Sequence, residues 1–251
     1  MNCEAYPSEA ALANALAGRL IDLVSRNPAL VLGLPTGRTP LALYAELIRL
    51  THDRRVDWSQ VRTFNLDEFV GLGAGDTGSY HSFMRDRLFD GLGIAREQIE
   101  FLNGRAADLD AECDRYETAL AKAGGMDVLI LGIGVNGHIG FNEPASALVA
   151  HTHRATLDDR TRAANALWFD GNVNRVPPEA LTMGMATILS ARSIVLIATG
   201  EAKSDAVREM LEGGVTTRVP ASFLQLHAQV TLMFDDMVAD ELDGCRAINR
   251  R

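Results

Sequence analysis

The sequence predicts an α/β fold: a three-layer α/β/α, Rossmann-like arrangement in which helices cover both faces of a mostly parallel sheet. Apolar runs of strand length at 29–34, 128–131 and 193–199 are nearly unbroken, as expected of strands that are buried on both faces. Segments with helical apolar spacing alternate with these runs, which is the order that produces parallel βαβ units. With 251 residues and no linker, residues 1–251 are expected to form a single domain.

The predicted elements follow one another in a regular order. Ser8 is expected to cap a helix that ends at Asn27-Pro28, and Pro40 to begin a helix over 41–50. The other elements expected in the first half are strands at 29–34, 61–66 and 128–131 and helices at 80–89 and 109–123. Those expected in the second half are an irregular region at 145–178 with a helix start at 156–162 and a loop at 171–178, a helix at 181–189, a strand at 193–199, a helix from 200 to 212, and a strand at 229–234 before a short helix.

Composition excludes several classes of function. Apolar residues make up 47% of the chain and charged residues 23%, which is ordinary for a globular protein. The formal net charge of −9 gives no support to a nucleic-acid surface, so an anionic ligand would need positive groups gathered locally. The three cysteines, Cys3, Cys113 and Cys245, are scattered, which favours a cytoplasmic protein with reduced thiols. No signal segment or membrane-spanning apolar run is visible, so we expect no membrane partner.

The most informative stretch is Met126–Pro144. A buried strand breaks at Gly132, Gly134 and Gly137, and polar residues follow directly: Asn136, His138, Asn142 and Glu143. Ligands of open α/β sheets bind at the carboxyl ends of the strands, so this stretch is a candidate site. A lone histidine would more often be structural, but a carboxylate and an amide close by in the sequence favour a proton-transfer role for His138.

A dinucleotide-binding loop is the main alternative for this stretch. Gly132-x-Gly134-x-x-Gly137 matches that fingerprint, which also requires a helix to begin at its last glycine. The residues that follow, His-Ile-Gly-Phe-Asn-Glu-Pro, are too irregular for a helix and end in proline. The sequence therefore disfavours dinucleotide binding.

Three further segments offer chemistry at predicted strand ends. Pro35–Pro40 is a glycine-containing turn with hydroxyl groups before a helix, which suits a phosphate, although an ordinary βα turn is the alternative. Asp67 and Glu68 follow the 61–66 strand and could supply a general base or form a solvated loop. Lys203 is a candidate anion contact, with a solvated surface lysine as the alternative.

Several segments together resemble the glucosamine-6-phosphate deaminases, also called glucosamine-6-phosphate isomerases, over nearly the whole chain. The segments that carry the resemblance are Gly33–Pro40, Phe64–Leu72, Ser79-Tyr80, Gly132–Pro144, Ala180–Gly184 and Leu224–His227. The related 6-phosphogluconolactonases share the fold and a Gly-His pair in the glycine loop, but they lack the Phe-Asn-Glu-Pro ending at 141–144.

The resemblance implies an enzyme that converts glucosamine 6-phosphate and water to fructose 6-phosphate and ammonia without a metal or organic cofactor. It implies that His138 carries the proton of the ring oxygen, oriented by Glu143, and that Asp67 moves a proton from C2 to C1. Asn136 completes the implied catalytic set. The implied substrate- and phosphate-binding residues are Thr36, Gly37, Arg38, Thr39, Gly132 and Lys203.

Three departures from the family pattern stand out. Asn136 replaces an aspartate that is common there; it can still orient His138 by hydrogen bonding, and asparagine occurs in the family too. Leu167 occupies the position of a phosphate-binding arginine, and Arg38 stands where a small residue is usual. We therefore expect the phosphate-binding charge to have moved to Arg38. Residues 151–156 keep little of the basic activator site of hexameric members, so we expect no such activation and leave homo-oligomerisation open.

Other functions fit parts of the pattern. The amino sugar could be galactosamine 6-phosphate instead of glucosamine 6-phosphate. A lactone hydrolase on the same fold would not need Asp67 and Glu143 in these contexts. A non-catalytic sugar-phosphate sensor would explain Leu167 and Asn136, but it has no need to keep Asp67, His138 and Glu143 together.

Overall fold

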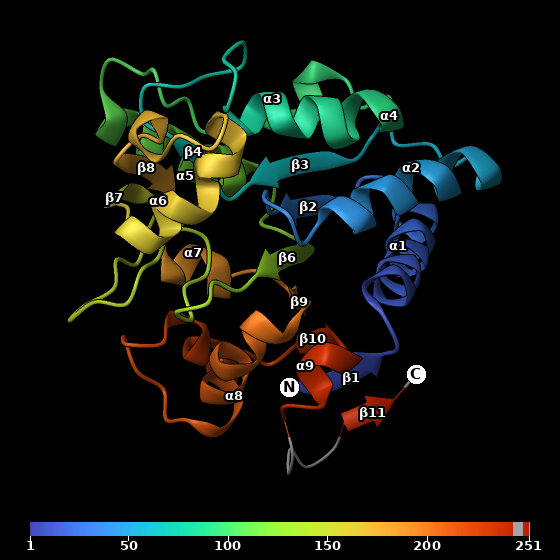
Figure 1. Cartoon of the computed structure of the whole chain (residues 1–251). Helices are drawn as coiled ribbons and strands as arrows, with labels where there is room; N and C mark the ends of the chain where they lie inside the picture. The colour runs from blue at the N-terminus through green and yellow to red at the C-terminus, as the bar shows by residue number, and fades with distance from the viewer. Residues whose placement is uncertain (243–247, 251) are drawn as a thin grey trace.

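The computed structural model describes residues 1–242 and 248–250, so Cys245 lies outside the described residues. Its centre is an eight-stranded sheet in the order β11-β1-β10-β9-β6-β2-β3-β5, and every pairing in this sheet is parallel (Figure 1). The strands are β1 Asn2–Tyr6, β2 Val31–Leu34, β3 Arg62–Asn65, β5 Ile99–Glu100, β6 Val128–Gly132, β9 Ser193–Ala198, β10 Val230–Asp235 and β11 Ile248–Arg250. The predicted α/β class is confirmed.

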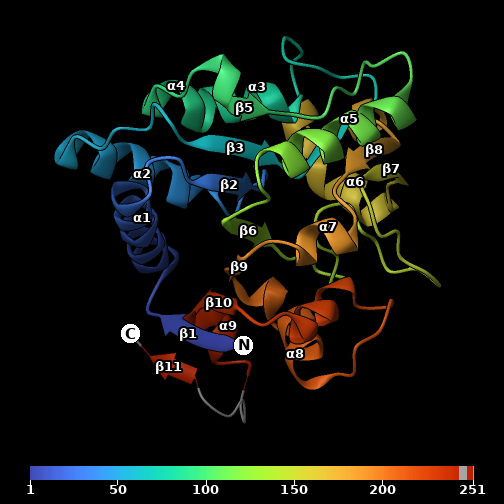
Figure 2. The same ribbon diagram turned by 180° about the vertical axis from the view of Figure 1, so that it is seen from behind.

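Helices cover both faces of this sheet, as Figures 1 and 2 show from opposite sides. One apolar core contains α1 Glu9–Arg26, α2 Leu41–Arg54, the end of α3 Tyr80–Met84 and α4 Asp90–Leu92. The other contains α5 Leu109–Lys122, α7 Met185–Leu189, α8 Ser204–Glu212 and α9 Asp236–Ala239. Val128 and Ile130 of β6 belong to the first core, and Leu129 and Leu131 to the second. The unbroken apolar run therefore has the predicted cause, which is burial on both faces.

A second, smaller sheet was not predicted. It is antiparallel, in the order β4-β8-β7, with β4 Asp67–Phe69, β8 Glu179–Thr182 and β7 His153–Thr156. The predicted helix at 181–189 is therefore wrong at its start, because 179–182 is strand and α7 begins only at Met185. These strands are three or four residues long and pair across long separations, so no local periodicity marks them.

Two other predictions need correction. Strand β1 was missed because Glu4 interrupts its apolar pattern; Glu4 is buried, accepts a hydrogen bond from Tyr6 Oη and forms an ion pair with Arg19. The helix expected at 80–89 is α-helical only to Met84 and continues as a π-helical turn over Arg85–Phe89.

The order of the strands fixes the place of a ligand site. From β2 the chain builds outward through β3 and β5, and then returns to the other side of β2 with β6, β9 and β10. Strand β2 is hydrogen-bonded to β3 on one side and to β6 on the other. Within the large sheet the chain continues from β2 to β3 and from β6 to β9, so the connections that follow these two neighbouring strands run in opposite directions. At such a topological switch point the loops separate and leave a crevice at the carboxyl ends of the strands.

Replacing Gly104 by alanine should destabilise the loop that supports β4. A Cβ atom at Gly104 would lie 2.0 Å from the Phe69 carbonyl oxygen, so the backbone must move. We expect Gly104→Ala to lower the free energy of unfolding by about 1–3 kcal/mol, as overpacking does, in urea denaturation. Gly18→Ala in α1 is the matched control: its Cβ would meet nothing within 4 Å, and it should add roughly 0.5–1 kcal/mol. Equal effects at the two positions would contradict the packing described.

Candidate active site

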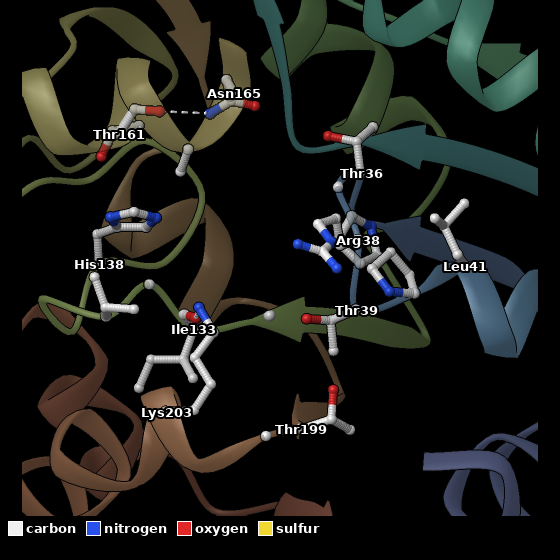
Figure 3. Close-up of a pocket in the computed structure, with 18 of the residues that line it drawn as sticks. Thr36, Arg38, Thr39, Leu41, Ile133, His138, Thr161, Asn165, Thr199 and Lys203 are labelled. Carbon is white, nitrogen blue, oxygen red and sulfur yellow. Dashed lines mark hydrogen bonds between the residues drawn. The ribbon is translucent and has the colours of Figure 1, made fainter. Parts of the chain in front are cut away.

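A cavity of about 910 Å³ opens at the switch point, between the carboxyl ends of β2, β6 and β9 and the helix α6 Asp159–Asn165 (Figure 3). The structure brings together the 35–40 turn, Asp67, the glycine loop after β6 and Lys203. The predicted site residues that line the cavity are Thr36, Gly37, Arg38, Thr39, Asp67, Gly132, Asn136, His138 and Lys203. The remaining one, Glu143, stands behind His138 and contacts it.

The glycine loop after β6 wraps closely around His138. The Gly134 N–H donates to the His138 carbonyl (2.9 Å), and the Gly137 N–H donates to the Gly134 carbonyl (3.0 Å). A Cβ atom at Gly134 would lie 2.3 Å from the imidazole Cε1, and Gly137 has a φ of +80°. Both positions therefore require glycine, for space and for backbone conformation. No helix follows Gly137 before α6, as expected from the argument against a dinucleotide site.

His138 and Glu143 form the expected pair. The imidazole Nδ1 lies 3.3 Å from Glu143 Oε2, although the ring N–H is not aligned for a linear hydrogen bond. Glu143 Oε2 also accepts a hydrogen bond from Asn136 Nδ2 (2.8 Å), and Oε1 accepts one from Thr161 Oγ1 (2.5 Å). Burial alone would raise the pKa of Glu143, but His138, Thr161 and Asn136 outweigh it and hold that pKa below its ordinary value. Glu143 is therefore an ionised partner for His138.

Asn136 has partners that differ from those expected. Its side-chain oxygen accepts the backbone N–H of His138 (3.3 Å), and its amide group donates to Glu143. Asn136 therefore orients the carboxylate and the loop, and it reaches the imidazole only through Glu143. Asn142 of the same stretch is structural: it is 3% exposed, and its Nδ2 donates to the carbonyl groups of Ile139 and Met183.

The adjacent carboxylates Asp67 and Glu68 have opposite environments. Glu68 is fully buried and accepts hydrogen bonds from Phe69 N (2.8 Å) and Tyr80 N (3.1 Å) at Oε1, and from Ser79 Oγ (2.8 Å) and His81 N (3.0 Å) at Oε2. The Asp67 carboxylate lines the cavity, and no residue of the described part of the chain donates a hydrogen bond to it. Adjacent residues of a strand point to opposite faces, so Glu68 anchors α3 while Asp67 faces the ligand.

Burial raises the pKa of Asp67 to about 8, and the negative charge of Glu68 adds to this shift. Burial also raises the pKa of Glu68, and its four hydrogen bonds oppose that effect without cancelling it. Two neighbouring carboxyl groups with different environments are a recurring arrangement at sites of acid–base chemistry. Asp67 is the one of the pair that can exchange a proton with a ligand.

The residues of the expected phosphate site come from two walls of the cavity. Figure 3 shows Thr36, Arg38 and Thr39 on the loop between β2 and α2, with Lys203 approaching from the loop after β9. Lys203 Nζ donates to the Ile133 carbonyl (2.7 Å), and burial lowers its pKa. The alternative of a solvated surface lysine is therefore excluded. Arg38 is exposed at the cavity wall.

Sequence reasoning missed the wall formed by α6 and the 3₁₀ turn Ala166–Phe169. The residues of this wall that line the cavity are Arg160, Thr161, Ala164, Asn165 and Trp168. Their spacing corresponds to one helical face, and this was the signal available in the sequence. Asn165 Oδ1 also accepts a hydrogen bond from Tyr80 Oη (2.7 Å), which ties α6 to α3. Leu167 is 59% exposed and does not line the cavity.

Within residues 1–242 and 248–250, no three or more His, Cys, Asp or Glu side chains gather as a metal ion would require. None of the helices over those residues has the length and apolar character needed to cross a membrane.

Comparison with known proteins gives a consistent result. The sequence model of the family described as glucosamine-6-phosphate isomerases/6-phosphogluconolactonase matches residues 7–233. The glucosamine-6-phosphate deaminase of Thermoanaerobacter pseudethanolicus is 45% identical over 216 residues, 86% of this chain and 85% of the relative. Glucosamine-6-phosphate deaminase 1 of Bacillus subtilis is 43% identical over 235 residues, 94% of this chain and 96% of the relative.

Solved structures agree with the sequence comparison. A monomeric glucosamine-6-phosphate deaminase superposes with a TM-score of 0.93 at 41% identity, covering 96% of this chain and 100% of that chain. The 6-phosphogluconolactonase of Trypanosoma cruzi superposes with a TM-score of 0.74 at 21% identity, covering 96% and 97% of the two chains. At that identity the second similarity concerns the fold alone.

The buried Asp67 should make stability depend on pH in a defined direction. Folding raises its pKa from 3.8 to about 8, so the stability that its proton provides is complete below pH 4 and is lost as the pH rises to 8. Asp67→Asn does not titrate, so its melting temperature should rise relative to the wild type across that window, by on the order of 10 °C. Glu97→Gln, at an exposed carboxylate, is the control. A pH-independent difference between Asp67→Asn and the wild type would show that Asp67 is not titrating in this environment.

Proposed function

The chain belongs to the glucosamine-6-phosphate isomerase/6-phosphogluconolactonase family, and we propose that it is a deaminase that converts glucosamine 6-phosphate and water to fructose 6-phosphate and ammonia. One observation carries this proposal: the unpartnered Asp67 carboxylate shares a cavity with the separate pair His138–Glu143. The reaction needs one group for ring opening and a second for moving the C2 proton, and these residues supply both.

Ring opening is assigned to His138. The pyranose ring opens when the ring oxygen gains a proton and the C1 hydroxyl loses one, which leaves an aldehyde at C1. An imidazole that faces the cavity can carry this proton, and the ionised Glu143 behind it stabilises the imidazolium form. Thr161 and Asn136 fix the carboxylate in turn, so the pair is oriented before the substrate arrives.

Proton transfer between C2 and C1 is assigned to Asp67. The carboxylate removes the C2 proton of the open-chain sugar to give an enolamine, and it returns that proton to C1. With a pKa of about 8, much of Asp67 is in its protonated form near neutral pH. A substrate ammonium group at C2 lies beside the carboxylate and favours its ionised, basic form.

Release of ammonia completes the reaction. Return of the proton to C1 leaves an iminium group at C2, and water adds there to form a carbinolamine. Collapse of that intermediate expels ammonia and gives the ketone of fructose 6-phosphate. Each step moves protons and one water molecule, so the chemistry is within reach of the side chains named. Hydrolysis of a lactone would require no C2 base and would leave the position of Asp67 without a role.

The phosphate group is assigned to the loop Thr36–Thr39 and to Lys203. The loop precedes α2, whose first N–H groups and dipole favour an anion. Arg38 adds a guanidinium at the cavity wall, and Lys203 adds an ammonium group held in place by the Ile133 carbonyl. Gly132 has open space around its Cα, so a ligand can approach the backbone there. All these residues belong to one chain, so we propose that a single copy of the chain is sufficient for the reaction. We also propose that the protein acts in the cytoplasm, as its scattered cysteines favour.

The direct test is a coupled assay of the purified protein. Glucosamine 6-phosphate, galactosamine 6-phosphate and unphosphorylated glucosamine would each be supplied, with ammonia and the ketose phosphate measured. We expect ammonia and fructose 6-phosphate in equal amounts from the first substrate, and a loss of turnover of about 100-fold or more in Asp67→Asn. Calorimetric binding of these sugars without turnover of any of them would contradict the deaminase proposal and favour a sensor.

Arg38→Ala tests the proposed relocation of the phosphate-binding charge. A charge-assisted hydrogen bond to the phosphate is worth about 1.5–3 kcal/mol, so KM for glucosamine 6-phosphate should rise roughly 10- to 100-fold. The turnover number should change less than about threefold, because Arg38 does not touch the reacting carbons. Arg87→Ala, at an exposed arginine outside the cavity, is the matched control. A small and equal effect on KM and kcat would argue against the relocation.

A further inference from the structure

A second unpaired guanidinium lines the same cavity from the opposite wall. Arg160 belongs to α6 and contributes to the cavity lining together with Thr161 and Asn165. Within the residues that the structure describes, its side chain has no hydrogen bond or ion pair, and its backbone N–H donates to the capping Asp158. An exposed arginine needs no partner, but this one is among the residues that line a ligand-sized space.

The neighbouring arginine of α6 shows the contrast. Arg162 Nη2 donates to the carbonyl groups of Val173 and Val176 (both 3.2 Å), and its Nη1 lies 3.7 Å from Asp159. Arg162 therefore holds the following turn in place and does not line the cavity. Of the two arginines on this helix, only Arg160 is available to a ligand.

The position of α6 relative to the catalytic pair is fixed by hydrogen bonds. Thr161, the next residue after Arg160, donates to Glu143, and Asn165 accepts from Tyr80. Figure 3 shows Thr161 and Asn165 above His138 on this side of the cavity. In a hexose 6-phosphate the ring oxygen and the carbon that carries the phosphate are both bonded to C5. A group on the wall beside His138, which acts on the ring oxygen, is therefore close to the phosphate end.

The balance of charge in the cavity also favours a contact between Arg160 and the substrate phosphate. The chain carries a formal charge of −9, and three acidic residues also line the cavity: Glu9, Asp67 and Asp235. Lys203 gives part of its donor capacity to Ile133, and burial lowers its pKa. A phosphate monoester carries nearly two negative charges and three acceptor oxygens, and each oxygen can accept more than one hydrogen bond, so a third cationic partner can contact it beside Arg38 and Lys203. Guanidinium groups bind such oxygens in pairs.

We propose that Arg160 is a further substrate-binding residue, which grips the substrate phosphate from the α6 wall while Arg38 grips it from the wall formed by the loop after β2. This inference rests on the proposed function for the identity of the sugar, but the phosphate contact itself does not depend on turnover. Arg160 would also help the site to distinguish phosphorylated from unphosphorylated sugars, because a ligand without the phosphate gains nothing from either guanidinium.

Arg160→Gln, Arg160→Lys and the control Arg87→Gln test this assignment. Kd would be measured by calorimetry for fructose 6-phosphate and for inorganic phosphate, and KM and kcat for glucosamine 6-phosphate. Arg160→Gln should weaken both phosphate ligands by about 10- to 50-fold and raise KM to a similar extent, with kcat within about threefold. Arg160→Lys should be intermediate, because it keeps the charge without the planar fork. Arg87→Gln should match the wild type.

The alternative outcomes are distinct. If Arg160→Gln weakens fructose 6-phosphate but leaves inorganic phosphate unchanged, Arg160 contacts the sugar and the phosphate assignment is overturned. If it binds both ligands like Arg87→Gln, Arg160 is a solvated surface residue. Wild-type protein that binds both ligands in an Arg160-dependent manner but releases no ammonia would refute the proposed deaminase and leave the phosphate contact standing.

Discussion

The site depends on one constraint: two adjacent carboxyl groups on a three-residue strand, Asp67 and Glu68, have different environments. Glu68 accepts one hydrogen bond from Phe69 N and three from the segment that begins α3, so it stays in place, and these bonds oppose the rise that burial causes in its pKa. Burial and, after it, the charge of Glu68 raise the pKa of the neighbouring Asp67. The polar interactions that fix the strand therefore also create a carboxyl group able to exchange protons near neutral pH.

The smaller antiparallel sheet and α6 complete the cavity that the large sheet begins. Strand β4 pairs with β8, and Thr182 of β8 accepts the N–H of Phe141 in the glycine loop (3.0 Å). The aromatic ring of Phe141 stacks on that of Tyr80 at a centroid distance of 6.0 Å, and Tyr80 Oη in turn donates to α6. Asp67, the His138–Glu143 pair and the α6 wall are thus joined through a contiguous set of packed and hydrogen-bonded side chains, and their geometry is set by tertiary contacts.

The distinction between strand-end loops and tertiary contacts explains which parts of the site could be predicted from the sequence. The 35–40 turn and the 132–143 loop each follow a buried apolar run, so a strand-end rule places them in one crevice without further information. Asp67 was found in the same way, although its own strand was not. Thr161 and Arg160 were missed because their approach to the cavity depends on α6 crossing over the glycine loop. The start of the 181–189 segment was misassigned for a related reason: β8 is defined by its partners β4 and β7, and no local pattern records them.

The distribution of positive charge has a consequence for catalysis. Arg38, Lys203 and Arg160 come from three separate elements, so a phosphate that contacts all of them would hold these elements in one arrangement. The helix that carries Arg160 also carries Thr161, which is hydrogen-bonded to Glu143 and so bears on His138. Binding energy from the phosphate, which is remote from C1 and C2, can therefore be used to seat α6 and align the proton-transfer pair. The chain has a net negative charge, so an anionic substrate is attracted to the one cavity where these three cations gather. A phosphate held there would both anchor the substrate and order the residues around His138.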